Sequence, residues 1–182
     1  MNFTEKQLTK EYILKGKIIN VRRDSVLVPN GNTSTREIVE HKGGVCVVAL
    51  TENNEILFVN QFRYAYGEEI LEIPAGKRDS ANEDPLKCAI RELREETGVT
   101  AKNIFPLGQL YPTPGYCNEI IWMYGATDLT YGEQDLDENE FLNVEKIPFD
   151  TAVEMVLNGE IKDAKTQTAV LKFKLLKDSG KI

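Results

Sequence analysis

The stretch GKRDSANEDPLKCAIRELREETGV, residues 76–99, predicts a loop that leads into a well-delimited helix. Asp84 suits the N-cap, Pro85 suits the first helical position, and Gly98 suits the left-handed residue at which a helix ends. On a helical wheel, residues 84–97 separate an apolar stripe from an acidic face. The stripe comprises Leu86, Ala89, Ile90 and Leu93, and the acidic face comprises Glu92, Glu95 and Glu96.

The acidic face of this helix is unfavourable for an isolated helix. Glu92, Glu95 and Glu96 lie three and four positions apart, where like charges repel one another. The last turn is also the negative end of the helix dipole, which disfavours acidic residues. A divalent cation would offset both effects, because magnesium prefers hard oxygen ligands. A solvated acidic face stays open as the alternative, since runs of charge usually face solvent.

Strands and two further helices are predicted around this helix. The apolar run 45–50 is typical of a strand buried on both faces, and Asn30-Gly31 is typical of a hairpin turn. The other predicted strands are 13–21, 25–28, 33–40, 56–62, 69–73, 104–111, 120–126 and 141–146, and the further helices are 151–158 and 164–177. We expect an α/β or α+β fold in which helices sandwich a mixed β-sheet. Residues 1–42 should form a small N-terminal antiparallel sheet, and residues 43–182 should form the main domain.

The composition restricts the classes of partner. The chain has 182 residues, of which 41% are hydrophobic and 28% charged, with a formal net charge of −7. Such a chain lacks the basic stripe that nucleic acids require. No apolar stretch approaches the roughly 20 residues of a membrane helix, and the N-terminus lacks the apolar core of a signal peptide. We therefore expect a cytoplasmic protein without nucleic-acid or membrane partners.

The cysteines and the single histidine suggest no chemistry of their own. Cys46, Cys88 and Cys117 are widely spaced, so we expect reduced thiols rather than a disulfide framework or a structural zinc site. His41 lies in a strand-like run without a nearby nucleophile, and a histidine-based catalytic triad is not expected.

Residues 76–99 resemble the Nudix box, which reads G, five residues, E, seven residues, then REUxEExGU with U aliphatic. The match is complete from Glu83 onward. Six residues rather than five separate Gly76 from Glu83, so a strict alignment would place Lys77 at the glycine position. We interpret this difference as a one-residue insertion in the loop before the helix.

The resemblance implies a magnesium-dependent hydrolase of pyrophosphate bonds, with manganese as a substitute metal. Glu92 and Glu96 would be metal ligands. Glu95 would be a further ligand, or a catalytic group that contacts the ligands rather than the metal. Arg91 would orient the carboxylates, and the backbone carbonyl of Ala75 would be another ligand. Magnesium neutralises charge on phosphate oxygens and acidifies bound water, which is the chemistry that this hydrolysis needs.

Features outside the box resemble the ADP-ribose pyrophosphatase branch of the family. In that branch the segment with Pro114, Gly115 and Glu119 contacts the terminal ribose, and the arginine of Gln61-Phe62-Arg63 faces the diphosphate. An acidic loop supplies the base, which by resemblance is Glu138, and Glu140 would be an occasional metal ligand. The N-terminal sheet implies a homodimer. The expected reaction is hydrolysis of ADP-ribose to AMP and ribose 5-phosphate.

Two alternatives stay open at this level. Another nucleoside diphosphate sugar, such as a GDP-sugar, would fit the same motifs. A Nudix-like domain that senses a nucleotide without cleaving it is disfavoured, because the box carboxylates are kept and no basic surface for DNA is evident. Aromatic residues such as Phe3, Tyr64 and Tyr66 are candidates for stacking on the base, although each is equally suited to packing.

Overall fold

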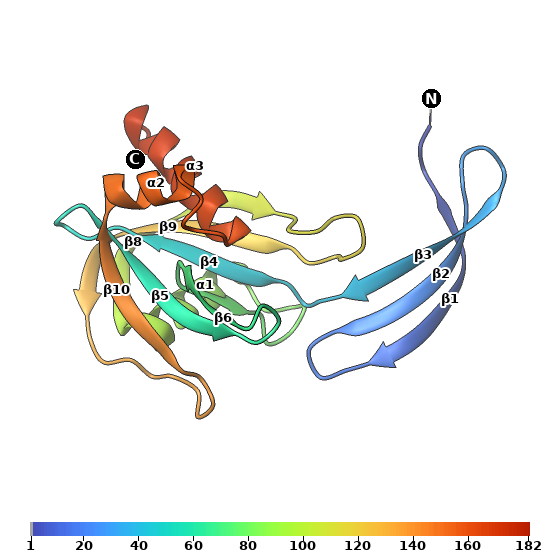
Figure 1. Ribbon diagram of the computed structural model, residues 1–182, viewed down its shortest axis with the longest axis horizontal. Helices are drawn as coiled ribbons and strands as arrows, with labels where there is room; N and C mark the ends of the chain where they lie inside the picture. The colour runs from blue at the N-terminus through green and yellow to red at the C-terminus, as the bar shows by residue number, and fades with distance from the viewer. Residues whose placement is uncertain (1) are drawn as a thin grey trace. The chain divides into compact units, whose positions relative to one another are not determined.

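The computed structural model describes residues 2–182 and divides the chain into two compact units (Figure 1). The first unit comprises the chain up to Gly43 together with Tyr111–Ile120. The second comprises Gly44–Leu110 and Ile121–Ile182. Residues 111–120, which join two strands of the second unit, therefore belong structurally with the N-terminal segment.

The first unit is built on an antiparallel sheet in the order β1-β2-β3. Its strands are β1 (Lys6–Lys15), β2 (Asn20–Leu27) and β3 (Thr33–Glu40). Gly31 has a φ of 86° in the loop between β2 and β3, so the hairpin there is confirmed. The segment 111–120 joins this sheet through Val39, whose N–H donates to Tyr116 O at 2.7 Å and whose carbonyl accepts from Asn118 N at 3.1 Å.

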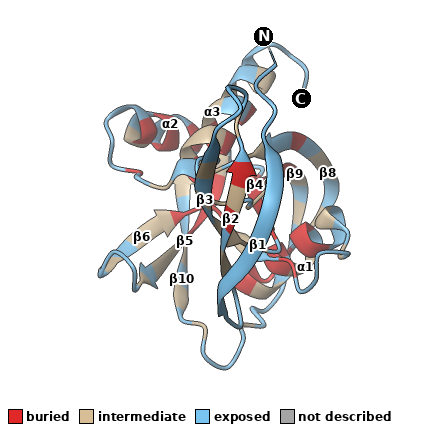
Figure 2. Ribbon diagram, turned by 90° about the vertical axis from the view of Figure 1, so that its right-hand side faces the viewer, coloured by how far each residue is buried: buried red, intermediate tan, exposed pale blue. Residues whose placement is uncertain are grey.

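The prediction of one strand over residues 13–21 is wrong. The chain reverses between β1 and β2, and the Gly16 N–H donates to Ile19 O at 3.0 Å to close the turn. The apolar run misled the prediction because Ile18 and Ile19 lie in the turn with exposed side chains. β1 is exposed along its whole length (Figure 2).

The second unit contains two sheets. A four-stranded sheet has the order β7-β4-β9-β8, in which β4 and β9 are parallel and the other neighbours antiparallel. A three-stranded antiparallel sheet has the order β10-β5-β6. The bounds are β4 (Gly44–Ala49), β5 (Glu55–Arg63), β6 (Glu68–Glu72), β7 (Ala75–Lys77), β8 (Val99–Leu110), β9 (Ile121–Tyr131) and β10 (Leu142–Pro148). The short strand β7 was not expected from the sequence.

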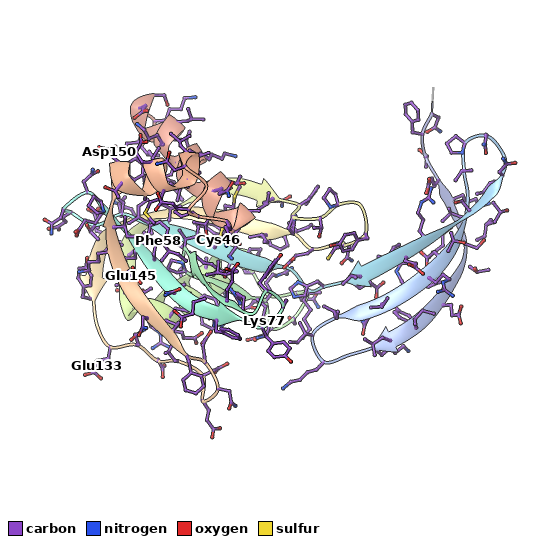
Figure 3. All side chains as sticks on the ribbon, in the orientation of Figure 1. Cys46, Phe58, Lys77, Glu133, Glu145 and Asp150 are labelled. Carbon is purple, nitrogen blue, oxygen red and sulfur yellow. The ribbon has the colours of Figure 1, made fainter. Side chains whose placement is uncertain are left out.

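Helices α1 (Pro85–Thr97), α2 (Phe149–Leu157) and α3 (Ala164–Asp178) complete the second unit. Alternate residues of β4 are buried on opposite faces. Val45 and Val47 pack in a cluster with α1, whereas Cys46 and Val48 pack in a cluster with α2 and α3. Figure 3 labels Cys46 and Phe58 within the second cluster. The predicted sandwich of helices around a mixed sheet is confirmed.

Helix α1 begins and ends where its sequence predicts. Asp84 is the N-cap and accepts from Leu86 N at 2.8 Å, Pro85 opens the helix, and Gly98 ends it with a φ of 70°. None of the helices among residues 2–182 combines the length and the apolar character that spanning a bilayer requires.

The buried face of α1 differs from the predicted apolar stripe. The side chains of Leu86 and Ile90 are 37% and 46% exposed, so half of that stripe faces outward. The buried residues are Cys88, Ala89, Glu92, Leu93, Glu96 and Thr97. The helix is therefore rotated so that two glutamates, rather than two aliphatic residues, point into the unit.

All three cysteines are free thiols, as expected. Burial raises the pKa of the Cys46 and Cys88 thiols to about 12. Because the thiolate is the reactive form of cysteine, these two residues act as packing groups.

Candidate active site

The site is centred on the buried carboxylates of Glu92 and Glu96, which α1 presents toward β7. The Ala75 N–H donates to Glu96 Oε2 at 2.8 Å, so the carboxylate is fixed against the strand. Ile73 and Pro74 join β6 directly to β7, whose first two residues are Ala75 and Gly76. The start of β7 therefore lies beside both glutamates.

Gly76 allows the Glu92 carboxylate to lie directly against the backbone of β7. A Cβ on Gly76 would lie 1.9 Å from Cδ of Glu92 and 2.1 Å from Oε2, so the carboxylate would have to move away. Lys77, in contrast, has an exposed side chain. The glycine that the box requires is thus Gly76, and the extra residue lies after it.

The inserted residue is accommodated in the loop 78–84. Arg78 is buried there and donates to the carbonyls of Ala81 and Glu83, each at 2.5 Å, and its guanidinium lies 4.7 Å from the ring centroid of Trp122. The Glu83 carboxylate accepts from Asp79 N at 2.7 Å and from Arg91 Nη2 at 3.3 Å. Glu83 therefore ties the loop to the helix.

Burial dominates the electrostatics of the two central carboxylates. Desolvation raises the pKa of Glu92 to about 7 and that of Glu96 to about 8. Arg91 opposes the shift at Glu92, whereas the negative charge of Glu140 adds to the shift at both. Burial and the neighbouring negative charge therefore disfavour the charged form of both carboxylates.

Arg91 is the cation that the box itself provides. Its Nη1 donates to Glu92 Oε1 at 2.8 Å and to Glu95 Oε2 at 2.9 Å. The structure thus brings together three of the predicted site residues on α1. Glu95 is partly exposed at the edge of this group.

The donor atoms fit a divalent cation by their chemistry. Glu92 and Glu96 offer hard carboxylate oxygens in a buried setting, and the Gly76 backbone leaves room for the carboxylate of Glu92. In the described range 2–182, no three His, Cys, Asp or Glu side chains are already arranged to hold a metal ion. Arg91 instead pairs with the Glu92 carboxylate. A cation would therefore bind Glu92 and Glu96 with some rearrangement of Arg91.

The acidic loop begins at an anchor on the end of α1. Asp135 N donates to Glu95 O at 3.0 Å, Arg94 pairs with the Asp135 carboxylate at 3.0 Å, and Gly132 N donates to Gly98 O at 2.7 Å. Glu133, labelled in Figure 3, is exposed in this segment. The anchor holds the start of the loop beside the helix that carries the box.

Beyond Asp135 the loop makes few contacts. No side chain from Leu136 to Glu140 forms a hydrogen bond or ion pair with the rest of the described chain, residues 2–182. Glu138 is exposed in a turn, whereas Glu140 is partly buried and its charge acts on Glu92 and Glu96. The structure therefore brings Glu140, but not Glu138, into the electrostatic surroundings of the box.

Arg63 ends β5 in the same unit and is held by a residue that the sequence analysis did not single out. Its Nε and Nη2 donate to the two oxygens of Glu72 at 2.5 and 2.6 Å. Lys165 of α3 donates to the same carboxylate. Glu72 lies in the apolar run Ile70–Ile73, and this isolated charge was the only sequence signal for it.

The predicted ribose-binding segment belongs to the first unit. Pro114 and Gly115 are exposed, and Glu119 Oε1 lies 3.1 Å from His41 Nδ1. A groove of about 550 Å³ runs along this segment and is lined by residues including Arg22, Arg36, Tyr111, Pro114, Gly115 and Glu119. No sequence pattern indicated that His41 contacts Glu119, because 78 positions separate them.

Two known protein families match this chain. Residues 40–168 match the NUDIX domain family, and residues 5–39 match the nucleoside diphosphate sugar hydrolase N-terminal domain. The chain belongs to the Nudix hydrolase family. The first match covers the box and most of the second unit, and the second match covers most of the N-terminal sheet.

This Nudix protein is similar in sequence to several known proteins. It is 42% identical to an ADP-ribose pyrophosphatase of Bacillus subtilis, over 91% of this chain and 90% of the relative. It is 41% identical to a protein of Bacillus methanolicus named methanol dehydrogenase activator, over 92% and 91%. A GDP-mannose pyrophosphatase of Yersinia enterocolitica is 33% identical over 77% and 79%.

A solved structure has the same fold as this Nudix protein. The crystal structure of an ADP compounds hydrolase superposes with a TM-score of 0.85 and covers 100% of both chains at 20% identity. At that identity the likeness concerns the fold alone. It extends over both units of the chain.

Proposed function

We propose that this Nudix protein hydrolyses the pyrophosphate bond of ADP-ribose, to give AMP and ribose 5-phosphate by attack of water. The observation that carries the proposal is the pair of buried carboxylates, Glu92 and Glu96, packed against Ala75 and Gly76 of β7. The named relative at 42% identity over most of the chain supports ADP-ribose as the substrate.

Magnesium is the proposed metal, with manganese as a substitute. Glu92, Glu96 and the Ala75 carbonyl would hold it, with Glu95 and Glu140 as additional ligands. Bound there, it would neutralise charge on the diphosphate and lower the pKa of a bound water. Arg91 would keep the carboxylates oriented, because it already spans Glu92 and Glu95.

The proposed substrate-binding roles concern Arg63 and the segment 114–119. Arg63 would bind the diphosphate, since a guanidinium donates to phosphate oxygens in a fixed geometry. Glu119, with Pro114 and Gly115, would contact the terminal ribose. Glu138 would take the proton from the attacking water after its loop closes over the box helix.

A substrate panel tests the proposal most directly. Purified protein with magnesium is incubated with ADP-ribose and other nucleoside diphosphate sugars, and the products are separated by chromatography. We expect AMP and ribose 5-phosphate as the main products and loss of activity with a chelator. Equal or faster release of GMP from a GDP-sugar would favour the second candidate function, hydrolysis of a GDP-sugar. The similarity to a GDP-mannose pyrophosphatase supports that candidate.

Variants of the box helix test the metal site. Glu92→Gln and Glu96→Gln should each lower kcat by about a hundredfold or more, because each removes a charged ligand. Glu154→Gln, which changes an exposed carboxylate on α2, is the matched control and should be fully active. Near-normal turnover in both box variants would overturn the assignment of the site.

The proposed partner of the chain is a second copy of itself, paired through the N-terminal sheet. Exposed apolar side chains on and beside β1 support this pairing, namely Leu8, Ile13, Leu14 and Ile18. Several large apolar side chains left exposed on one short sheet are what an interface would cover. A cytoplasmic location and the lack of nucleic-acid or membrane partners stay predictions from composition.

A further inference from the structure

Glu72 at the end of β6 is a buried carboxylate between two cations. Its side chain is only 3% exposed, and it accepts from both Nε and Nη2 of Arg63. The Lys165 ammonium, whose side chain is 11% exposed, donates to Glu72 Oε2. A buried carboxylate of this kind stays charged only when it is paired and hydrogen-bonded, and here both oxygens are engaged.

The first turn of α3 holds Lys165 and the backbone next to Glu72 in place. Asp163 is the N-cap of α3 and also pairs with Lys165 at 3.1 Å. Thr166 Oγ1 accepts from the Ile73 N–H at 3.0 Å, so the residue next to Glu72 is bound to the same turn. Two separate links therefore join α3 to the segment that leads into β7.

The pairing leaves part of Arg63 free for a ligand. A guanidinium has five N–H donors, and the contacts to Glu72 use one on Nε and one on Nη2. The Nη1 edge is left over, and the Arg63 side chain is 39% exposed. Its pKa is raised first by the hydrogen bond to Glu72, and the charges of Asp163 and Glu96 add to the shift. Arg63 thus lies within the electrostatic reach of the box.

Without Glu72, Arg63 would be drawn toward other carboxylates. Glu96 is a carboxylate of the box whose charge acts on Arg63. A guanidinium that swings to Glu96 would compete with a metal there and would leave the diphosphate unbound. Holding Arg63 by two parallel hydrogen bonds prevents this and fixes the direction of the free edge.

We propose that Glu72 is a positioning residue for Arg63 and that Lys165, on α3, in turn positions Glu72. The inference rests on the proposed function, because Arg63 is taken to bind the diphosphate of the substrate. In this view the first turn of α3 contributes to substrate affinity, although its residues bind only protein groups.

Steady-state kinetics with ADP-ribose and magnesium test the proposal through the separation of KM from kcat. Glu72→Gln should raise KM about tenfold and change kcat by less than about twofold, because it loosens a binding group. Arg63→Met should raise KM at least as much. In the Arg63→Met background, Glu72→Gln should have no further effect on KM, since two residues that act as one unit are not additive.

Two further variants separate positioning from folding. Glu72→Gln removes one of the carboxylates that pair with the buried Lys165 and leaves the pairing with Asp163. Glu72→Gln combined with Lys165→Met removes both charges of the Glu72–Lys165 pair and should recover the Tm while KM stays raised. Lys162→Met removes an exposed cation that pairs with Glu68 and is the matched control, with unchanged KM. Circular dichroism checks the fold of every variant.

The outcomes distinguish this proposal from the proposed function. Every variant is also titrated with ADP, which carries the diphosphate without the terminal ribose, so Glu72 is tested even if ADP-ribose is not turned over. Wild-type KM and ADP affinity in a folded Glu72→Gln variant would overturn the positioning role and leave the function standing. An additive effect of Glu72→Gln in the Arg63→Met background would also overturn it. Absence of ADP-ribose hydrolysis, with ADP binding still dependent on Glu72 through Arg63, would reject only the substrate.

Discussion

At the scale of single residues, Gly76 determines how closely the Glu92 carboxylate approaches the backbone. Gly76→Ala would place a methyl group 1.9 Å from Glu92 Cδ, so the carboxylate must move. We expect kcat to fall about a hundredfold, the scale associated with a displacement of roughly 1 Å in a catalytic group. Lys77→Ala changes the neighbouring exposed side chain and should keep wild-type activity. Equal activity in the two variants would show that the contact is irrelevant to turnover.

Glu138 and Glu140 should differ in what they contribute. If Glu138 is the base, Glu138→Gln should lower kcat about a hundredfold with little change in KM, because the residue acts only in the transition state. Glu140→Gln should instead raise the magnesium concentration needed for half-maximal activity, since the charge of Glu140 acts on both buried glutamates. Magnesium titrations of kcat measure both effects. A reversed pattern would move the base to Glu140.

At the scale of elements, the N-caps of α1 and α3 should contribute differently to the stability of the fold. Asp84→Ala removes one bond to Leu86 N and should lower the free energy of unfolding by about 1 kcal/mol. Asp163→Ala removes bonds to the backbone and hydroxyl of Thr166 and the pairing with Lys165, so its cost should be greater. Urea unfolding compares the two variants. An equal loss would indicate that the Lys165 pairing adds nothing to stability.

The ion pair between Lys165 of α3 and Glu72 of β6 should make stability depend on acidity. Burial alone would raise the pKa of Glu72, but the hydrogen bond from Arg63 and the charge of Lys165 more than offset it, and the pKa is lowered. A carboxylate with a lowered pKa stabilises the fold above its unfolded pKa, and this contribution is lost as the pH falls through the folded pKa. The free energy of unfolding should therefore decrease below about pH 4.

Glu72→Gln should remove this part of the pH dependence, because the glutamine side chain does not titrate. Glu68→Gln, which changes an exposed ion pair with Lys162, should keep the wild-type slope. Urea unfolding at a series of acidic pH values measures the two slopes. A wild-type slope in Glu72→Gln would assign the acid sensitivity to other carboxylates.

At the scale of the whole molecule, we expect a homodimer with twice the chain mass of 20.6 kDa. A three-stranded sheet with an exposed edge strand is weakly stabilised by itself and needs a packing partner. Ile13→Lys combined with Leu14→Lys should give monomers in sedimentation experiments, because it places charges on the exposed face of β1. Leu175→Lys changes an exposed leucine of α3 in the other unit and should leave the dimer intact. A wild-type monomer at micromolar concentration would contradict the proposal.

The local sequence determined most of the elements and the identity of the catalytic helix. Asp84, Pro85 and Gly98 set the limits of α1, because capping depends on residues within one or two turns. The apolar run of β4 predicted burial on both faces, which the two clusters confirm. The spacing of the box glutamates, read together with the family resemblance, indicated the face of α1 that we propose binds the metal.

Only the tertiary structure decided what surrounds those residues. The wheel of α1 favoured burial of Leu86 and Ile90, yet the helix buries Glu92 and Glu96, because β7 offers an N–H donor and a glycine backbone to the carboxylates. The pairing of Glu72 with Arg63 and Lys165 joins residues up to 93 positions apart. Such contacts depend on which strands and helices pack together. No local pattern specifies them, because the free energy that favours them comes from burial in the folded chain.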